Sequence, residues 1–137
     1  MAEPFEAEAK AWMEKSWRDL EMAHRAVAGT PPFYDMAVYH CQQSGEKAVK
    51  AFLVLRGIVF EKTHDIEVLI ELASGIEPGF GELMDAADAL TPYATRFRYP
   101  NATFSIEPLP TEFAEALDHA KSIFDFVLML LPDQVRP

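Results

Sequence analysis

The 137-residue chain lacks the features that mark several large classes of protein. It has one cysteine, Cys41, which excludes an internal disulfide and suits a reducing compartment. Its longest apolar run, Phe126–Leu131, is far too short to cross a bilayer. The first ten residues are acidic and hold no apolar signal-peptide core. We therefore expect a cytoplasmic protein with no membrane association.

What is present is an ordinary globular composition, half apolar and one quarter charged, and we expect residues 1–137 to form a single domain. The formal net charge of −10 disfavours wholesale binding of nucleic acid, because a negative body repels phosphate. Two stretches depart from this balance. Residues 36–64 carry a local excess of Lys and Arg, and residues 89–106 contain Arg96 and Arg98 but no carboxylate. A small anion could therefore meet a locally basic site.

Apolar residues recur at helical spacing in five segments, and no strand-like alternation competes with them. The predicted helices run from about Ala7 to Ala28, from Pro32 to Arg56 with a cap at Gly57, from Thr63–Asp65 through Ile70, from Gly79 to Leu90, and from Thr111 to Pro132. The four prolines between residues 91 and 110 predict a loop. Short connections predict an all-α, up-and-down bundle of about five helices.

The second helix carries a narrow polar stripe, His40, Gln43, Lys47 and Lys50, opposite a broad arc of apolar and small residues. One interpretation is a solvated face with ion pairs to Glu46 or Glu61, each worth about 0–1 kcal/mol. The other is an anion or nucleotide site, in which Lys supplies charge, His a donor and Gln an amide. Both remain open from the residues alone.

Three segments resemble the HEPN domain (higher eukaryotes and prokaryotes nucleotide-binding). They are Tyr39–Leu53 with Gly57 and Lys62–Asp65, the element Arg98-Tyr99-Pro100, and Trp17–Leu20 with Ala23. The resemblance implies a five-helix bundle that is commonly a homodimer. It also implies a minimal nucleotidyltransferase as partner, which in several pairs is the antitoxin of an RNase toxin.

The RNases of this family carry an Arg and a His separated by four to six residues, near the end of the bundle. Here Arg18 and His24 meet that spacing, but they lie in the first helix. We therefore expect a nucleotide-binding or nucleotidyltransferase-partner module of a toxin–antitoxin-like pair. Its expected ligand-binding residues are His40, Gln43, Lys47, Lys50, Arg98 and Tyr99.

Two alternatives remain. One is a metal-independent RNase toxin, with RNA as its partner molecule, that acts through Arg96 or Arg98 together with His40 or His64. The other is a structural homodimerisation module without a ligand. The scattered histidines predict no metal site, and nothing indicates a cofactor.

Several single residues carry narrower expectations. Cys41 should be a packed core thiol, and His64 a cap or hydrogen-bond partner. Trp12 and Trp17 lie about 140° apart on a helix, so at most one is central to the core and the other suits an interface. The adjacent Glu46 and Lys47 cannot pair well with each other, and Arg98 and Tyr99 are the expected partners.

Overall fold

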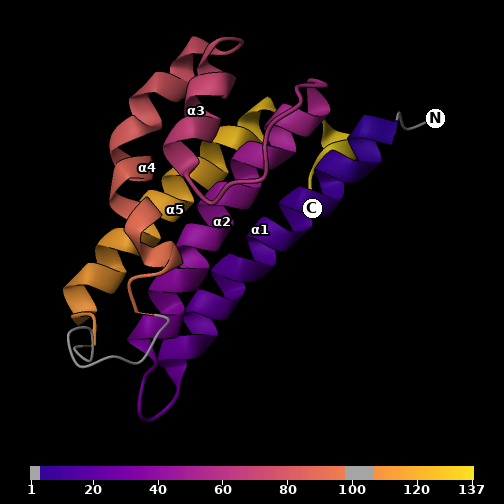
Figure 1. The fold of residues 1–137 in the computed structure, drawn as a ribbon. Helices are drawn as coiled ribbons and strands as arrows, with labels where there is room; N and C mark the ends of the chain where they lie inside the picture. The colour runs from indigo at the N-terminus through magenta and orange to yellow at the C-terminus, as the bar shows by residue number, and fades with distance from the viewer. Residues whose placement is uncertain (1–3, 98–106) are drawn as a thin grey trace.

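The computed structural model describes residues 4–97 and 107–137, and within these ranges all regular structure is helical (Figure 1). The α-helices are α1 (Pro4–Ala28), α2 (Tyr34–Leu55), α3 (Ile66–Ser74), α4 (Met84–Leu90) and α5 (Pro110–Leu130). Three short 3-10 helices accompany them, η1 (Pro78–Leu83), η2 (Thr91–Ala94) and η3 (Asp133–Val135). The predicted all-α bundle is confirmed. The predicted fourth helix is 3-10 in its first half, where Pro78 and two glycines disfavour an α-helix.

Helices α1 and α2 form a long antiparallel hairpin along one edge of the bundle (Figure 1). The turn between them is closed by the Phe33 amide, which donates to the Ala26 carbonyl over 2.8 Å. The inward face of α1 consists of six residues at helical spacing, Ala9, Met13, Ser16, Asp19, Leu20 and Ala23. One of these, Asp19, is a carboxylate among apolar neighbours. Its burial determines much of the site described below.

Helix α2 is the central element, packed by α1, α3 and α5. A Cβ atom added at Gly45 would lie 3.2 Å from a Leu90 methyl, 3.3 Å from an Ile123 methyl and 3.4 Å from an Ile66 methyl. These side chains belong to α4, α5 and α3, so four helices converge at this glycine. The small residues of α2 permit the close approach that the sequence predicted.

The chain reverses after α2 at Gly57, whose φ of +69° is the left-handed conformation that favours glycine at a helix end. Residues 58–65 then run back along α2 to the start of α3. The Asp65 carboxylate accepts a hydrogen bond from the Glu67 amide at 3.0 Å and so caps α3, as expected for this stretch. Residues 58–65 thereby become a cover over the middle of α2. Among the described residues, no helix combines the length and apolarity needed to span a bilayer.

Candidate functional site

The polar stripe of α2 is not a solvated face. Lys50 and Gln43 are buried, and the side chains of His40 and Lys47 are only 19% and 22% exposed. The expectation of a solvated face is wrong because α1 and residues 58–65 cover α2 where the stripe lies. Since buried charges need partners, the stripe residues and their neighbours form two ion-paired clusters.

The first, the Asp19 cluster, joins α1 to α2 through Asp19, His40 and Lys47. One Asp19 oxygen lies 2.8 Å from Nδ1 of His40, and the other accepts from Nζ of Lys47 at 2.8 Å. The pairing engages Nδ1 of His40 and leaves Nε2 as the ring nitrogen away from Asp19. This is the arrangement in which a carboxylate orients an imidazole and fixes its tautomer.

The second, the Glu46 cluster, is more deeply enclosed and consists of Gln42, Gln43, Glu46, Lys50 and His64. Glu46 is its centre: Oε2 accepts from Nζ of Lys50 at 2.9 Å, and Oε1 accepts from Gln42 at 3.1 Å. The same Oε1 lies 2.9 Å from Nδ1 of His64. Gln42 also donates to the His64 carbonyl at 3.2 Å and accepts from Gln43 at 2.7 Å. Every buried side-chain polar atom among the described residues has a partner.

The ammonium group of Lys50 is enclosed by aromatic rings as well as by Glu46. It lies 5.3 Å from the Trp12 ring centroid and 5.9 Å from that of Phe60, within the range of cation–π attraction. The side chains of Lys50 and Glu46 are 7% and 3% exposed. Such a lysine is unavailable to a ligand unless the cover formed by residues 58–65 opens. Trp12 is thus the core-facing tryptophan, and Trp17 is the exposed one.

The charges of both clusters balance internally. In each cluster one carboxylate faces one lysine and one imidazole. A phosphate would have to displace a carboxylate to reach Lys47 or Lys50. The clusters therefore resemble the interior of a folded domain more than an anion site.

Cys41 lies on the buried arc of α2, as predicted, and has no basic group paired with it. Burial, and secondarily the negative charge of Asp19, raise the pKa of its thiol from 9.0 to about 12. At neutral pH the group is therefore a neutral, packed thiol and not a nucleophile.

The basic residues after α4 are not joined to the stripe by any described contact. Arg96 instead approaches Glu112 of α5, with 3.7 Å between Nη1 and Oε2, and the Tyr93 hydroxyl donates to the same carboxylate at 3.2 Å. Burial, and then Glu112, raise the pKa of Tyr93. Arg98 and Tyr99, the expected partners of Glu46 and Lys47, lie outside the described residues. The partners observed are Lys50 and His64 for Glu46, and Asp19 for Lys47.

The remaining histidines are dispersed. His64 acts as a hydrogen-bond partner, as expected, although its side chain is 63% exposed. Arg18 and His24 are both exposed on α1, about 120° apart around the helix axis, and so do not converge. Within the described part of the chain, no group of three or more His, Cys, Asp or Glu side chains is arranged to hold a metal ion.

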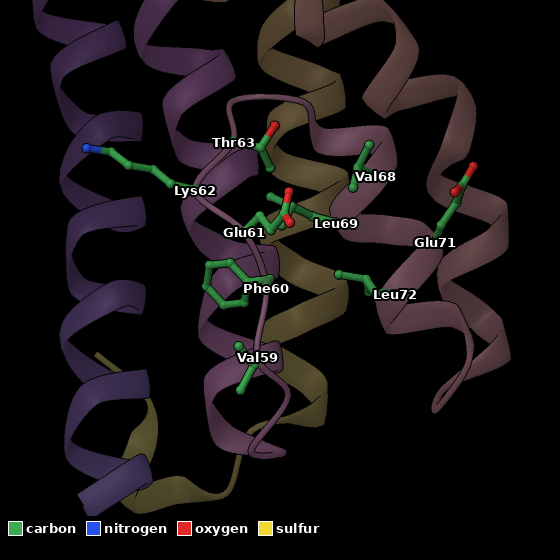
Figure 2. Close-up of a pocket in the computed structure, with 9 residues that line it drawn as sticks. All are labelled: Val59, Phe60, Glu61, Lys62, Thr63, Val68, Leu69, Glu71 and Leu72. Atoms are coloured by element: carbon green, nitrogen blue, oxygen red, sulfur yellow. The ribbon is translucent and has the colours of Figure 1, made fainter.

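A different surface lies on the other side of residues 58–65. Figure 2 shows a hollow between the extended residues 59–63 and α3, with Val68, Leu69 and Leu72 contributed by the helix. Its volume is about 580 Å³. Val59 is 93% exposed, and Val68 and Leu72 are also exposed. We call this surface the α3 groove.

The rim of the α3 groove is acidic. Glu61 and Glu71 line it, and Glu67 lies on the same helix. A hydrogen bond with Asp88 of α4 is the main reason that the pKa of Glu67 is raised, followed by desolvation and by repulsion from Asp88. The excess of negative charge here matches a partner with a basic rim.

Asp19 and the hub role of Glu46 were missed by sequence reasoning. A signal for Asp19 was available, because its position on α1 places a carboxylate on the face shared with Ser16, Leu20 and Ala23. The hub role of Glu46 depends on the return of residues 58–65 over α2, which no local pattern encodes. The α3 groove was missed because its apolar residues look like core residues in the sequence.

A five-helix bundle with a long α1–α2 hairpin and a polar, ion-paired seam along α2 defines the class of fold. The HEPN domain family matches residues 9–130, nearly the whole chain, and the chain belongs to that family.

The bundle superposes on TT1696 from Thermus thermophilus with a TM-score of 0.73 and 31% identity, covering 90% of this chain and 98% of that one. It also superposes on ST0689, an archaeal HEPN homologue, with a TM-score of 0.69 and 27% identity, covering 87% and 93%. A 54-residue stretch is 44% identical to "Putative toxin MJ1304" of Methanocaldococcus jannaschii. That stretch covers 39% of this chain and 34% of the length of that relative.

Proposed function

We propose that this chain is the toxin-like HEPN member of a two-protein pair and that its partner is a minimal nucleotidyltransferase, docked in the α3 groove. The observation that carries the proposal is the exposure of apolar side chains along this groove, with Val59 at 93%. Exposed apolar surface with a polar rim is typical of protein interaction sites. The likeness of part of the chain to a protein named as a toxin supports the toxin-like role.

The two clusters of the stripe favour a protein partner over a nucleotide as the first ligand. Lys47 is already bound to Asp19, and Lys50 is buried against Glu46. A nucleotide phosphate would have to break one of these pairs in order to bind. A protein that docks on the α3 groove breaks none of them.

Affinity purification of the tagged full chain from its native host tests the proposal. We expect mass spectrometry to identify a small nucleotidyltransferase as a stoichiometric partner. The double variant Val59→Glu, Leu72→Glu should lose it, because two charges would enter the groove. Met129→Glu is the matched control, since Met129 is also an exposed apolar residue but lies on α5. Recovery of no nucleotidyltransferase by the wild type, or equal recovery by the groove variant, contradicts the proposal.

A second candidate function is a metal-independent RNase, and one observation favours it. Nδ1 of His40 is held 2.8 Å from Asp19, so that Nε2 is oriented as a base. In this reaction Nε2 takes the proton of a ribose 2′-OH, the 2′-oxygen attacks the adjacent phosphorus, and the bond to the 5′-oxygen breaks. A 2′,3′-cyclic phosphate and a 5′-hydroxyl result. Lys47 or Arg96 would steady the phosphate charge.

Expression of the chain in a bacterial host, followed by RNA cleavage in the presence of EDTA, tests this second function. We expect growth arrest and cleavage that are lost in His40→Ala and reduced in Asp19→Asn, and retained in the control His24→Ala. Unimpaired growth at high expression with no cleavage product would reject the RNase and leave the partner proposal standing.

A further inference from the structure

The outward face of α1 carries alternating charges in a self-complementary order. Glu14, Arg18, Glu21 and Arg25 follow one another at spacings of four, three and four, so they lie on one stripe of the helix. This stripe is opposite the buried face of α1. Within the described residues none of the four takes part in an ion pair. The stripe lies along the outer edge of the bundle (Figure 1).

The order of these charges becomes meaningful when two copies of α1 lie antiparallel. With a twofold axis between Asp19 and Leu20, Arg18 of one copy lies opposite Glu21 of the other. In the same register Glu14 lies opposite Arg25. Both pairs then occur twice, as isologous symmetry requires. One register thus matches every charge with its opposite.

The spacing also suits the packing of two helices. Positions four, three and four apart form the seam of a heptad pattern, which is the geometry of antiparallel coiled coils. At both ends of the seam the same register brings Ala11 opposite Ala28, and both are exposed. Two alanines allow the helices to approach closely.

Large apolar side chains flank the seam. Trp17 is 47% exposed and Met22 is 44% exposed, and they lie on opposite flanks of the charged stripe. Because the twofold axis keeps each flank facing itself, Trp17 meets the second Trp17 and Met22 meets the second Met22. Shallow hollows of about 460 Å³ and about 250 Å³ border Trp17, the second shared with Met22. Buried tryptophans are among the residues that contribute most to interface stability.

We propose that the outward face of α1 is a homodimer interface, occupied by α1 of a second copy in this antiparallel register. The inference is independent of the proposed function, because the α3 groove lies on another part of the bundle. A single pair of helices buries less than the about 1,600 Å² typical of stable interfaces, so a dimer of micromolar affinity is expected. Because its charges lie partly in water, the dimer should weaken at about 1 M salt.

The competing explanation is a solvated face, stabilised only by pairs within one helix. Glu14 and Arg18 are four residues apart, as are Glu21 and Arg25, and such pairs contribute about 0.2–0.5 kcal/mol to a helix. That explanation predicts a monomer, so oligomeric state separates the two.

The test uses the full chain and two charge-reversed variants. Glu14→Arg with Glu21→Arg makes the stripe entirely positive, and Arg18→Glu with Arg25→Glu makes it entirely negative. We expect the wild type to dimerise in sedimentation analysis over about 1 to 100 μM, and each variant alone to be monomeric. An equimolar mixture of the two variants should form a heterodimer, because all facing charges are again opposite.

The matched control is Glu8→Lys with Lys15→Glu, two exposed residues of α1 about a quarter-turn or more from the stripe, which should dimerise as the wild type does. Circular dichroism verifies that every variant is folded. A monomeric wild type at about 100 μM, variants that still dimerise alone, or a mixture that stays monomeric each overturn the proposal.

Discussion

Residues 58–65 separate two surfaces that differ in every respect. On the side of α1, the ring of Phe60 covers the Glu46 cluster, whose lysine and glutamate are almost fully enclosed. On the side of α3, Val59 and its neighbours leave an apolar groove open to solvent (Figure 2). The polar residues are therefore structural here, and the apolar ones are available. Exposure, more than residue type, distinguishes the working surface from the scaffold.

The largest expected effect is the loss of the charge that balances Lys50. Glu46→Gln leaves a buried ammonium group without a carboxylate, and we expect the free energy of unfolding to fall by about 3–5 kcal/mol. Urea denaturation measures the change. The double variant Glu46→Gln, Lys50→Met should recover part of it, because the uncompensated charge is then gone. A loss below about 1 kcal/mol for the single variant would mean that the cluster is not structural.

The Asp19 cluster is more open than the Glu46 cluster, so its disruption should cost less. Asp19→Asn keeps the shape and removes the charge that His40 and Lys47 share, and we expect a loss of about 1–3 kcal/mol. Asp118→Asn, at an exposed position on α5, is the control and should have no effect. If Asp19→Asn destabilised the protein more than Glu46→Gln, the ranking of the two clusters would be reversed.

A smaller effect concerns Cys41 beside the Asp19 cluster. Its pKa is 9.0 in the reference state and about 12 in the fold, so the folded protein holds its proton more tightly. The stability from the protonated thiol is complete below pH 9 and falls as the pH rises toward 12, by about 1.4 kcal/mol per pH unit. Denaturation of the wild type and of Cys41→Ala between about pH 7 and pH 10.5 should show the decline only in the wild type. Parallel curves, or rapid reaction of the native thiol with a disulfide reagent at about pH 8, would contradict the assignment.

The bundle could be predicted from the sequence because helical spacing, the glycine after α2 and the prolines of residues 91–110 are local signals. The polar stripe was found for the same reason, since its spacing is visible in the sequence. Its environment could not be found. The burial of Lys50 depends on Phe60 and Trp12, which come from separate elements. The α3 groove likewise exists only after residues 59–63 fold against α3.

The most direct test compares groove and stripe on the same partner, with variants that barely affect stability. Purified nucleotidyltransferase from the pull-down is titrated against the wild type, Val59→Glu with Leu72→Glu, and Lys47→Met. We predict that the groove variant weakens binding at least about 100-fold, the equivalent of about 2.7 kcal/mol, while Lys47→Met changes it less than about threefold. Loss of binding in Lys47→Met with full binding in the groove variant would contradict this assignment and return the function to the stripe.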